Sequence, residues 1–325
     1  MSGNGGADWR PTATMTALRR RAALLAGSRK FFAERGVIEV ETPLVGAAGP
    51  SDPQIECLVT QVTGMCGRLF LSTSPEFHMK RLLAAGSGDI YQLCKAFRDA
   101  ERGRWHNPEF TLLEWYRTGF DDTAMMAEVE HLVAEVLAPE RALPPAEHLT
   151  YGEALHRHAG IDAYAASERD LLDAARAHGI VCKTGLERDA MLDLLMGFVV
   201  GPRLGRDRPC FVRDYPASQA SLARLKPGLP PVAARFELYL DGIELANGFH
   251  ELADAGEQRG RFARDLGIRR ERGQAQPPVD ERLLAALVAG MPDCSGVALG
   301  IDRLVAIALK ATDLSQAMAF SIDNA

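Results

Sequence analysis

Residues 241–251, DGIELANGFHE, decide the fold of this chain, because they open with Asp-Gly, the strongest short signal for a tight hairpin turn. The preceding residues, 232–240, alternate in the manner of a strand, with Phe236 and Leu238 on one face and Glu237 on the other. An apolar run follows the turn. We therefore expect a β-hairpin here.

Three acids in this hairpin admit two interpretations. Glu237, Glu244 and Glu251 are spaced through otherwise apolar strands, where an unpaired carboxylate is costly. They are either solvated carboxylates on a half-exposed hairpin, or part of a site for a metal ion, a cationic substrate or both. The hairpin alone favours the first interpretation, and the rest of the chain favours the second.

The bulk composition is that of an ordinary globular protein, with room for one large domain or two medium ones. The formal net charge of −6 over 325 residues does not favour non-specific nucleic-acid binding. The six cysteines contain no CxxC pair, so reduced thiols in a cytoplasmic protein are the simplest account. No stretch approaches the roughly 20 apolar residues of a membrane span, and we expect no membrane association.

The first part of the chain alternates helices with strands. Residues 1–17 are predicted to be a flexible tail, and a helical pattern from about residue 16 leads into a strand over 37–41. Ser74-Pro75-Glu76 then opens a helix, because Ser fits a cap and Pro fits a first turn. Glu76 is interpreted at this point as a carboxylate near the positive end of the helix dipole.

A charged loop between two predicted strands is a second candidate site. Strands over 90–97 and 109–116 flank the segment 98–106, RDAERGRWH, which contains three arginines and a histidine. Guanidinium groups bind phosphates bidentately and do not lose their charge. The loop is therefore either a phosphate-binding loop or a solvated one.

Residues of about 140–205 are predicted to form a small inserted helical subdomain. The last part of the chain adds a turn that is suited to binding an anion. A small-residue strand over 295–300 then runs into a helix that carries Arg303, and Gly300 lets a ligand approach the backbone. Arginines together with paired acids suit a nucleoside triphosphate with magnesium, although the GxxxxGK[ST] loop is absent.

Five segments resemble a known family. FFAERGVIEVETP, FRDAERGRWHNPEFTLLEWY and SGVALGIDRL resemble the three motifs of the class II lysyl-tRNA synthetases, and TSPE and ELANGFHEL resemble the segments that form their lysine site. The resemblance runs from about Leu18 to the end of the chain. It implies an α+β fold with a class II synthetase-like antiparallel sheet flanked by helices, in one catalytic domain over 18–325.

Two departures point to a related family. Only a short tail precedes the first motif, where the synthetases have an anticodon-binding barrel, and Ala298 replaces the usual glycine of the third motif. Both features are similar to the stand-alone ligase paralogues that attach (R)-β-lysine to elongation factor P.

This resemblance implies an ATP- and Mg²⁺-dependent, cytoplasmic homodimer that adenylates (R)-β-lysine and transfers it to a lysine of elongation factor P. The alternatives are a synthetase core that acts on tRNA and a non-catalytic paralogue that binds an amino acid.

The resemblance assigns roles to matching positions. Arg98 and Arg303 are the implied catalytic residues, with Arg98 at the α-phosphate of ATP. The implied ATP-binding residues are Arg98, His106, Asn107, Phe110, Glu244, Leu245, Gly300 and Arg303. The implied amino-acid-binding residues are Ser74, Pro75, Glu76, Glu114, Tyr116, Asn247, Phe249, Glu251 and Ala298. The implied magnesium ligands are Glu237 and Glu244.

One position of the second motif departs from the family pattern. The motif usually reads Arg-x-Glu, and the Glu helps to recognise adenine, whereas Ala100 stands at that place here and Glu101 follows it. Either Glu101 takes the role after a small shift of the loop, or backbone groups read adenine. The implied reaction needs no covalent enzyme intermediate, so we expect catalysis by positioning and charge stabilisation.

Overall fold

The computed structural model describes residues 9–181 and 185–325, and nine strands in these ranges form one mixed sheet. Neighbouring strands are antiparallel except for the two outermost pairs, β1 with β5 and β7 with β8. The path through the sheet is β1 (Ile38–Glu39), β5 (Ile90–Phe97), β6 (Glu109–Thr118), β12 (Cys294–Gly300), β11 (Ile243–His250), β10 (Val232–Leu240), β8 (Cys210–Pro216) and β7 (Glu147–Thr150), with β9 (Leu225–Lys226) beside β10. The predicted α+β fold with a largely antiparallel sheet is confirmed.

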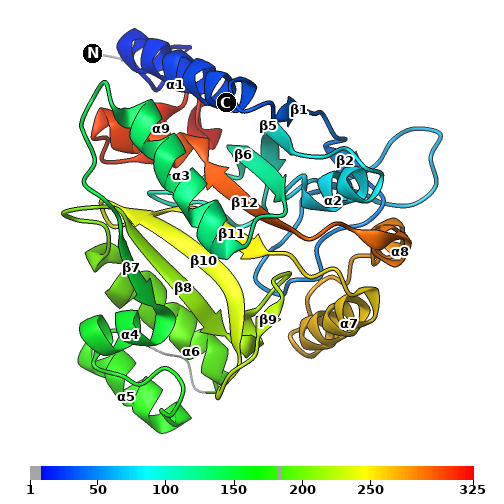
Figure 1. Cartoon of the computed structure of the whole chain (residues 1–325), viewed down its shortest axis with the longest axis vertical. Coiled ribbons are helices and arrows are strands. Elements are labelled where there is room, and N and C mark those ends of the chain that lie inside the picture. The colour runs from blue at the N-terminus through cyan, green and yellow to red at the C-terminus, as the bar shows by residue number, and fades with distance from the viewer. Residues whose placement is uncertain (1–8, 182–184) are drawn as a thin grey trace, which may run out of the picture.

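A second, three-stranded sheet is formed by short strands from the segment before the second helix. It consists of β2 (Val45–Gly46), β4 (Leu69–Leu71) and β3 (Val59–Thr60). Each of these strands is only two or three residues long. The intervening residues 61–68 are exposed and project from the molecule as a loop (Figure 1).

The helices cover the main sheet and surround one of its ends. They are α1 (Met15–Ala33), α2 (Glu76–Ala84), α3 (Asp122–Leu137), α4 (Tyr151–Ala159), α5 (Glu168–Ala177), α6 (Arg188–Leu195), α7 (Ala255–Glu271), α8 (Glu281–Gly290) and α9 (Ile301–Leu309). Figure 1 shows α3 crossing in front of the central strands, α4 to α6 gathered at the β7 end, and α7 and α8 together at another edge. No helix among the described residues is long and apolar enough to cross a membrane.

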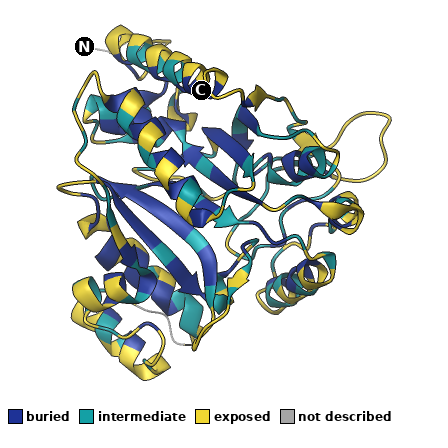
Figure 2. Ribbon diagram, in the orientation of Figure 1, coloured by how far each residue is buried: buried dark blue, intermediate teal, exposed yellow. Residues whose placement is uncertain are grey.

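The central hairpin forms as its sequence predicts. Asp241 and Gly242 both have positive φ, at 54° and 77°, which is the backbone that tight hairpins with a right-handed twist require. Alternation then sends Phe236 and Leu238 into the core beneath α3, and Tyr239 into a second cluster on the other face. The alternating pattern thus places one strand in two hydrophobic cores, and Figure 2 shows how buried residues run along the strands.

The segment predicted as a helical insertion, about 140–205, differs from that prediction at its start. Before its helices begin, β7 pairs in parallel with β8, so that Leu149 lies opposite Val212. The buried side chains of α4 to α6 share a cluster with β8 and β10, which includes Leu192 and Tyr239. The segment is therefore built onto the edge of the main sheet, because its helices bury their apolar faces against that sheet.

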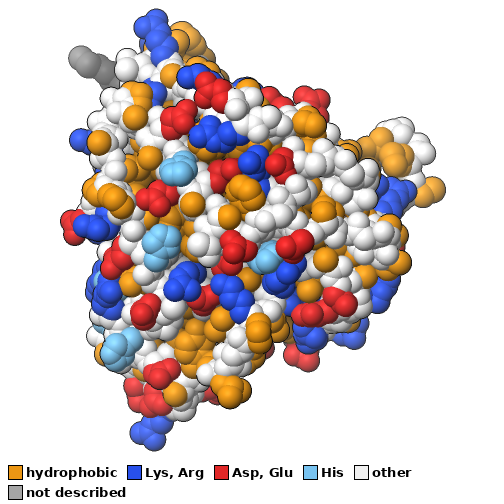
Figure 3. All heavy atoms as spheres, in the orientation of Figure 1, with side chains coloured by type: hydrophobic (Ala, Val, Ile, Leu, Met, Phe, Trp, Pro, Cys, Tyr) orange, Lys and Arg blue, Asp and Glu red, His pale blue; other side chains and the backbone are white. Residues whose placement is uncertain are grey.

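Helix α7 is rich in charged residues, yet some of its arginines are buried. Arg269 is only 1% exposed, and its guanidinium donates to the backbone oxygens of Asp52 and Ile55 at 2.8 and 3.1 Å and pairs with Glu56 at 2.7 Å. These contacts anchor the loop before β3, which forms part of the wall of the cavity described below. On the face shown in Figure 3, acidic and basic side chains are interspersed.

Candidate active site

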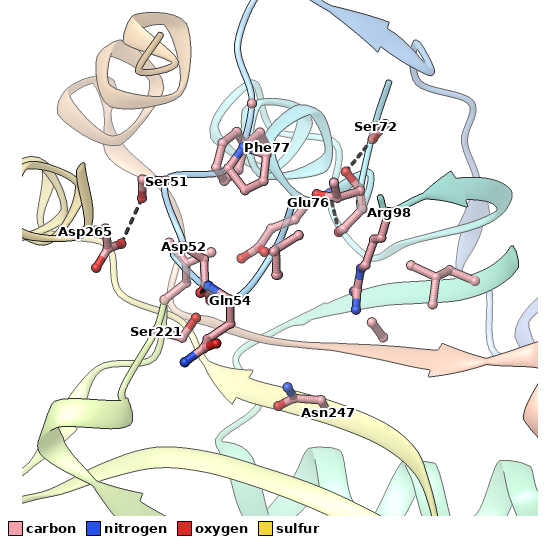
Figure 4. Close-up of a pocket in the computed structure, with 18 of the residues that line it drawn as sticks. Ser51, Asp52, Gln54, Ser72, Glu76, Phe77, Arg98, Ser221, Asn247 and Asp265 are labelled. Carbon is pink, nitrogen blue, oxygen red and sulfur yellow. Dashed lines mark hydrogen bonds between the residues drawn. The ribbon is translucent and has the colours of Figure 1, made fainter. Parts of the chain in front are cut away.

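A cavity of about 1750 Å³ lies beside strands β6, β11 and β12, and its wall also includes residues of α2, α7 and the loop after β5. It brings together all the site residues predicted from the sequence except Pro75 and Glu237. Figure 4 shows Glu76 and Arg98 reaching into it from one wall and Asn247 from the strand opposite. Segments far apart in the sequence therefore meet at one site.

Arg303 and His106 form one end of the cavity. The Arg303 guanidinium donates to the backbone oxygen of Glu244 at 2.8 Å and to that of Trp105 at 3.3 Å. Its Nη2 lies 2.9 Å from His106 Nε2. Because arginine can only donate, His106 Nε2 must accept, which requires a neutral ring. Burial and the neighbouring Arg303 lower the pKa of His106, in agreement with this.

Arg98 and Glu101 lie together on the same cavity wall. Arg98 Nη1 is 3.3 Å from Glu101 Oε1, and its guanidinium carbon lies 5.1 Å from the centroid of the Phe110 ring. Ala100 adopts a left-handed backbone with φ of 60°, and Glu101 reaches the cavity while Ala100 does not line it. Of the two alternatives for adenine recognition, this placement supports the one in which Glu101 acts.

Asn107 lines the cavity, but its side chain also ties two segments together. Its Nδ2 donates to the backbone oxygen of Glu109 at 2.6 Å, and its Oδ1 accepts from the backbone nitrogen of Ile322 at 3.0 Å. The side chain therefore fixes the end of the charged loop against the C-terminal segment. Leu245 and Gly300 complete this end of the wall.

Three carboxylates gather at the other end of the cavity. Glu114 is 2% exposed and accepts hydrogen bonds from Ser74 Oγ at 2.7 Å and Tyr116 OH at 2.9 Å. Burial and the nearby Glu76 carboxylate raise the pKa of Glu114 to about 8. Glu251 is fully buried, and burial raises its pKa to about 7.

We call this end of the cavity, around Glu76, Glu114 and Glu251, the carboxylate chamber. Two residues beside it were not identified from the sequence. Lys80 Nζ lies 2.7 Å from Glu76 Oε1 and 2.6 Å from Glu251 Oε2. The Glu76–Lys80 spacing of four residues is a signal for a helical ion pair, but such pairs are usually solvated. Gly296 is the second, since a Cβ there would lie 2.3 Å from the Tyr116 ring and 2.6 Å from Glu251 Oε1.

The remaining predicted substrate residues lie around this chamber. Asn247, Phe249 and Ala298 line the cavity, and Asn247 pairs with Ala298 across β11 and β12. Pro75 does not line the cavity and instead sits at the start of α2. Pro75, and not the predicted Ser74, is the N-cap residue, although Ser74 Oγ accepts from the backbone nitrogen of Glu76 at 3.1 Å.

The two predicted magnesium ligands differ in position. Glu237 binds Arg235 Nη2 and Tyr239 OH, each at 2.6 Å, and does not line the cavity. Glu244 does line the cavity. Burial and the nearby Glu237 carboxylate raise the pKa of Glu244. The described residues contain no group of three or more His, Cys, Asp and Glu side chains that could hold a metal. Of the two predicted ligands, Glu244 is thus the one that lines the cavity.

Comparison with known proteins places this geometry in context. The family model of the class II tRNA synthetases (D, K and N) matches residues 5–324. The chain is 49% identical over 325 residues to the elongation factor P–(R)-beta-lysine ligase of Pectobacterium atrosepticum, with 98% of each chain covered. It is 48% identical to the ligase of the same name from Salmonella paratyphi B, over 98% of this chain and 99% of that one.

Proposed function

The chain belongs to the class II tRNA synthetase family (D, K and N), and we propose that it is an ATP-dependent ligase. It adenylates (R)-β-lysine and transfers the β-lysyl group to a lysine side chain of elongation factor P. The names of its relatives support this function. The observation that carries it is the carboxylate chamber at one end of a cavity whose other end holds Arg98 and Arg303.

The charge of the chamber selects the class of amino acid. Glu76 and Glu251 pair with one buried cation, Lys80, while Glu114 accepts from the hydroxyls of Ser74 and Tyr116. Full ionisation of the three carboxylates beside Lys80 leaves two negative charges. A diamino acid has two ammonium groups, which offset those charges when it binds. The raised pKa values of Glu114 and Glu251 indicate that the empty chamber disfavours its own ionisation. A monoamine would leave one carboxylate without a partner.

The opposite end suits the phosphates and base of ATP. Arg98 binds the α-phosphate and stabilises the charge that develops during adenylation, while Arg303 and His106 hold the outer phosphates. Adenine stacks on Phe110, near the backbone at Leu245 and Gly300. Glu244 would hold Mg²⁺, whose charge offsets that of the phosphates. Glu237 could be a second Mg²⁺ ligand only if its hydrogen bond with Arg235 were broken.

The reaction then has two steps. The substrate carboxylate, directed towards Arg98 by its ammonium groups in the chamber, attacks the α-phosphorus and pyrophosphate leaves. An amine of elongation factor P next attacks the acyl carbon of the adenylate, forming an amide and releasing AMP. The protein supplies positioning and fixed charge in both steps, and no side chain forms a bond to the substrate.

The proposal includes a cytoplasmic homodimer that forms through α1 and β1. Its support is the first motif and the exposed Met15 and Ile38, at 62% and 55% exposure. The cytoplasmic location is supported by the free thiols among the described residues, which are Cys57, Cys66, Cys94, Cys210 and Cys294. Cys182 falls outside the described residues. Sedimentation velocity tests the dimer, and a monomer at micromolar concentration would contradict it.

The intact mass of purified elongation factor P tests the function. After incubation with this protein, ATP, magnesium and either β-lysine or α-lysine, we expect one lysyl increment that forms faster with β-lysine. An unchanged mass with lysylated tRNA in the same mixture would identify a synthetase core instead. Absence of ATP–pyrophosphate exchange with every amino acid would identify a non-catalytic paralogue.

A further inference from the structure

Lys80 is a buried cation that the proposed reaction does not use. Its side chain is 2% exposed, and its Nζ bridges Glu76 Oε1 and Glu251 Oε2 at 2.7 and 2.6 Å. Burial lowers the pKa of an ammonium group, but the Glu251 and Glu76 carboxylates outweigh burial and raise the pKa of Lys80. Lys80 is therefore a permanent positive charge.

Lys80 lies behind the wall of the cavity. Glu76 and Glu251 line the cavity, whereas Lys80 does not. Lys80 pairs ionically with Glu251 Oε2, whereas Oε1 has neither an ion pair nor a hydrogen bond among the described residues. That free oxygen lies beside Tyr116 and Gly296, which also line the cavity. The ion pair with Lys80 thus holds one oxygen of the carboxylate, and the other lies beside residues that line the cavity.

We propose that Lys80 is a positioning residue, which holds Glu251 so that its free oxygen receives the distal ammonium group of a diamino acid. The selection of a substrate with two ammonium groups then depends on a lysine that does not touch that substrate. This inference rests on the proposed function, because it assigns a cause to the amino-acid specificity of the same site.

Two other roles for Lys80 make different predictions. As a purely structural link between α2 and the end of β11, it would affect every substrate alike. As an occupant of the ammonium position, it would compete with the substrate, and its removal would tighten binding. Because Lys80 lies outside the cavity lining, the geometry favours positioning over competition.

The test compares Lys80→Met with the wild-type protein in ATP–pyrophosphate exchange, using β-lysine and 3-aminohexanoic acid, which lacks the distal ammonium. We expect the KM for β-lysine to rise about thirtyfold or more, since truncation of a buried charge pair has effects of that size. The KM values for 3-aminohexanoic acid and for ATP should change little. The preference for β-lysine should therefore collapse.

Matched variants separate the alternatives. Lys226 also bridges two carboxylates, Asp122 and Asp214, but outside the cavity, so Lys226→Met should leave the preference unchanged. Lys80→Arg keeps the charge and should retain part of the preference. Lys80→Gln keeps the polar reach but not the charge, and should lose the preference even if Lys80→Met fails to fold.

The outcomes are distinct. Equal losses with both amino acids in Lys80→Met and Lys80→Gln would overturn the positioning role in favour of a structural one. A lower KM for β-lysine would overturn it in favour of competition. A wild-type protein that activates no diamino acid would overturn the proposed function, and this inference with it, before any variant is compared.

Discussion

Replacement of Glu251 by glutamine tests the carboxylate chamber most directly. Glu251 has no exposure to solvent; it pairs directly with Lys80, and the Arg224 guanidinium also favours its charged form. Glutamine keeps the shape of the side chain and removes its charge. The substrate ammonium would then lose its ionic partner in a place that water does not reach.

The expected loss follows from this burial. Truncation of one partner of a buried, hydrogen-bonded charge pair costs about 2–5 kcal/mol, or roughly 30- to 5000-fold in Kd. An exposed pair would cost no more than about 1 kcal/mol. The affinity for ATP should change little, because Arg98 and Arg303 make no contact with Glu251 in the structure.

Isothermal titration calorimetry with β-lysine and with ATP, measured separately, decides the matter. Glu109→Gln is the matched control, because the Glu109 side chain is 48% exposed and pairs with Lys95 at 3.1 Å on the surface. Its affinities should match the wild type. If Glu251→Gln bound β-lysine within about threefold of the wild type, Glu251 would not contact the ammonium, and the charge argument for the chamber would fail.

Three further changes have equally definite outcomes. The pKa values of about 8 for Glu114 and about 7 for Glu251 lie above those of the unfolded chain, so the free protein should lose stability as pH rises from about 4.5 to 8, while the affinity for β-lysine should rise over the upper part of that range. Melting curves and calorimetry at several pH values check both trends, and flat profiles would contradict the pKa values. Ala298→Gly removes a methyl group from the cavity wall and should raise α-lysine activation relative to β-lysine by about 10- to 200-fold; an unchanged ratio would show that the methyl is not the selector. Glu101→Ala should raise the KM for ATP and weaken the preference for ATP over GTP in pyrophosphate exchange, and an unaltered preference would leave adenine recognition to backbone groups.

The sequence was informative about the cavity because its residues lie in short segments of distinctive composition. The side-chain types of Arg98, His106 and Arg303 indicated phosphate binding as one interpretation, and the resemblance to the family then implied those roles. Alternation along residues 232–240 also predicted that Phe236 and Leu238 share one face of the strand and that Glu237 lies on the other. Both inferences use local information, namely the chemistry of a side chain and the period of a strand.

Pairing between distant segments could not be read in the same way. Glu237 and Glu244 look equivalent in the hairpin, yet Arg235 and Tyr239 engage the first and only the second lines the cavity. Likewise, Glu76 was interpreted only as a carboxylate near the helix dipole, whereas Lys80 links it to Glu251, from the end of the sheet, in a buried bridge.

The sequence by itself determined the family, the hairpin and a set of candidate residues, nearly all of which line the cavity. Only the tertiary structure decided which carboxylates are buried, which already hold a cation, and which keep an oxygen free for a ligand. The physical reason is that the free energy of a buried charge depends on its solvent exposure and on the distance to its counter-charge. Both quantities are fixed only when α2, β6, β11 and β12 meet around one cavity.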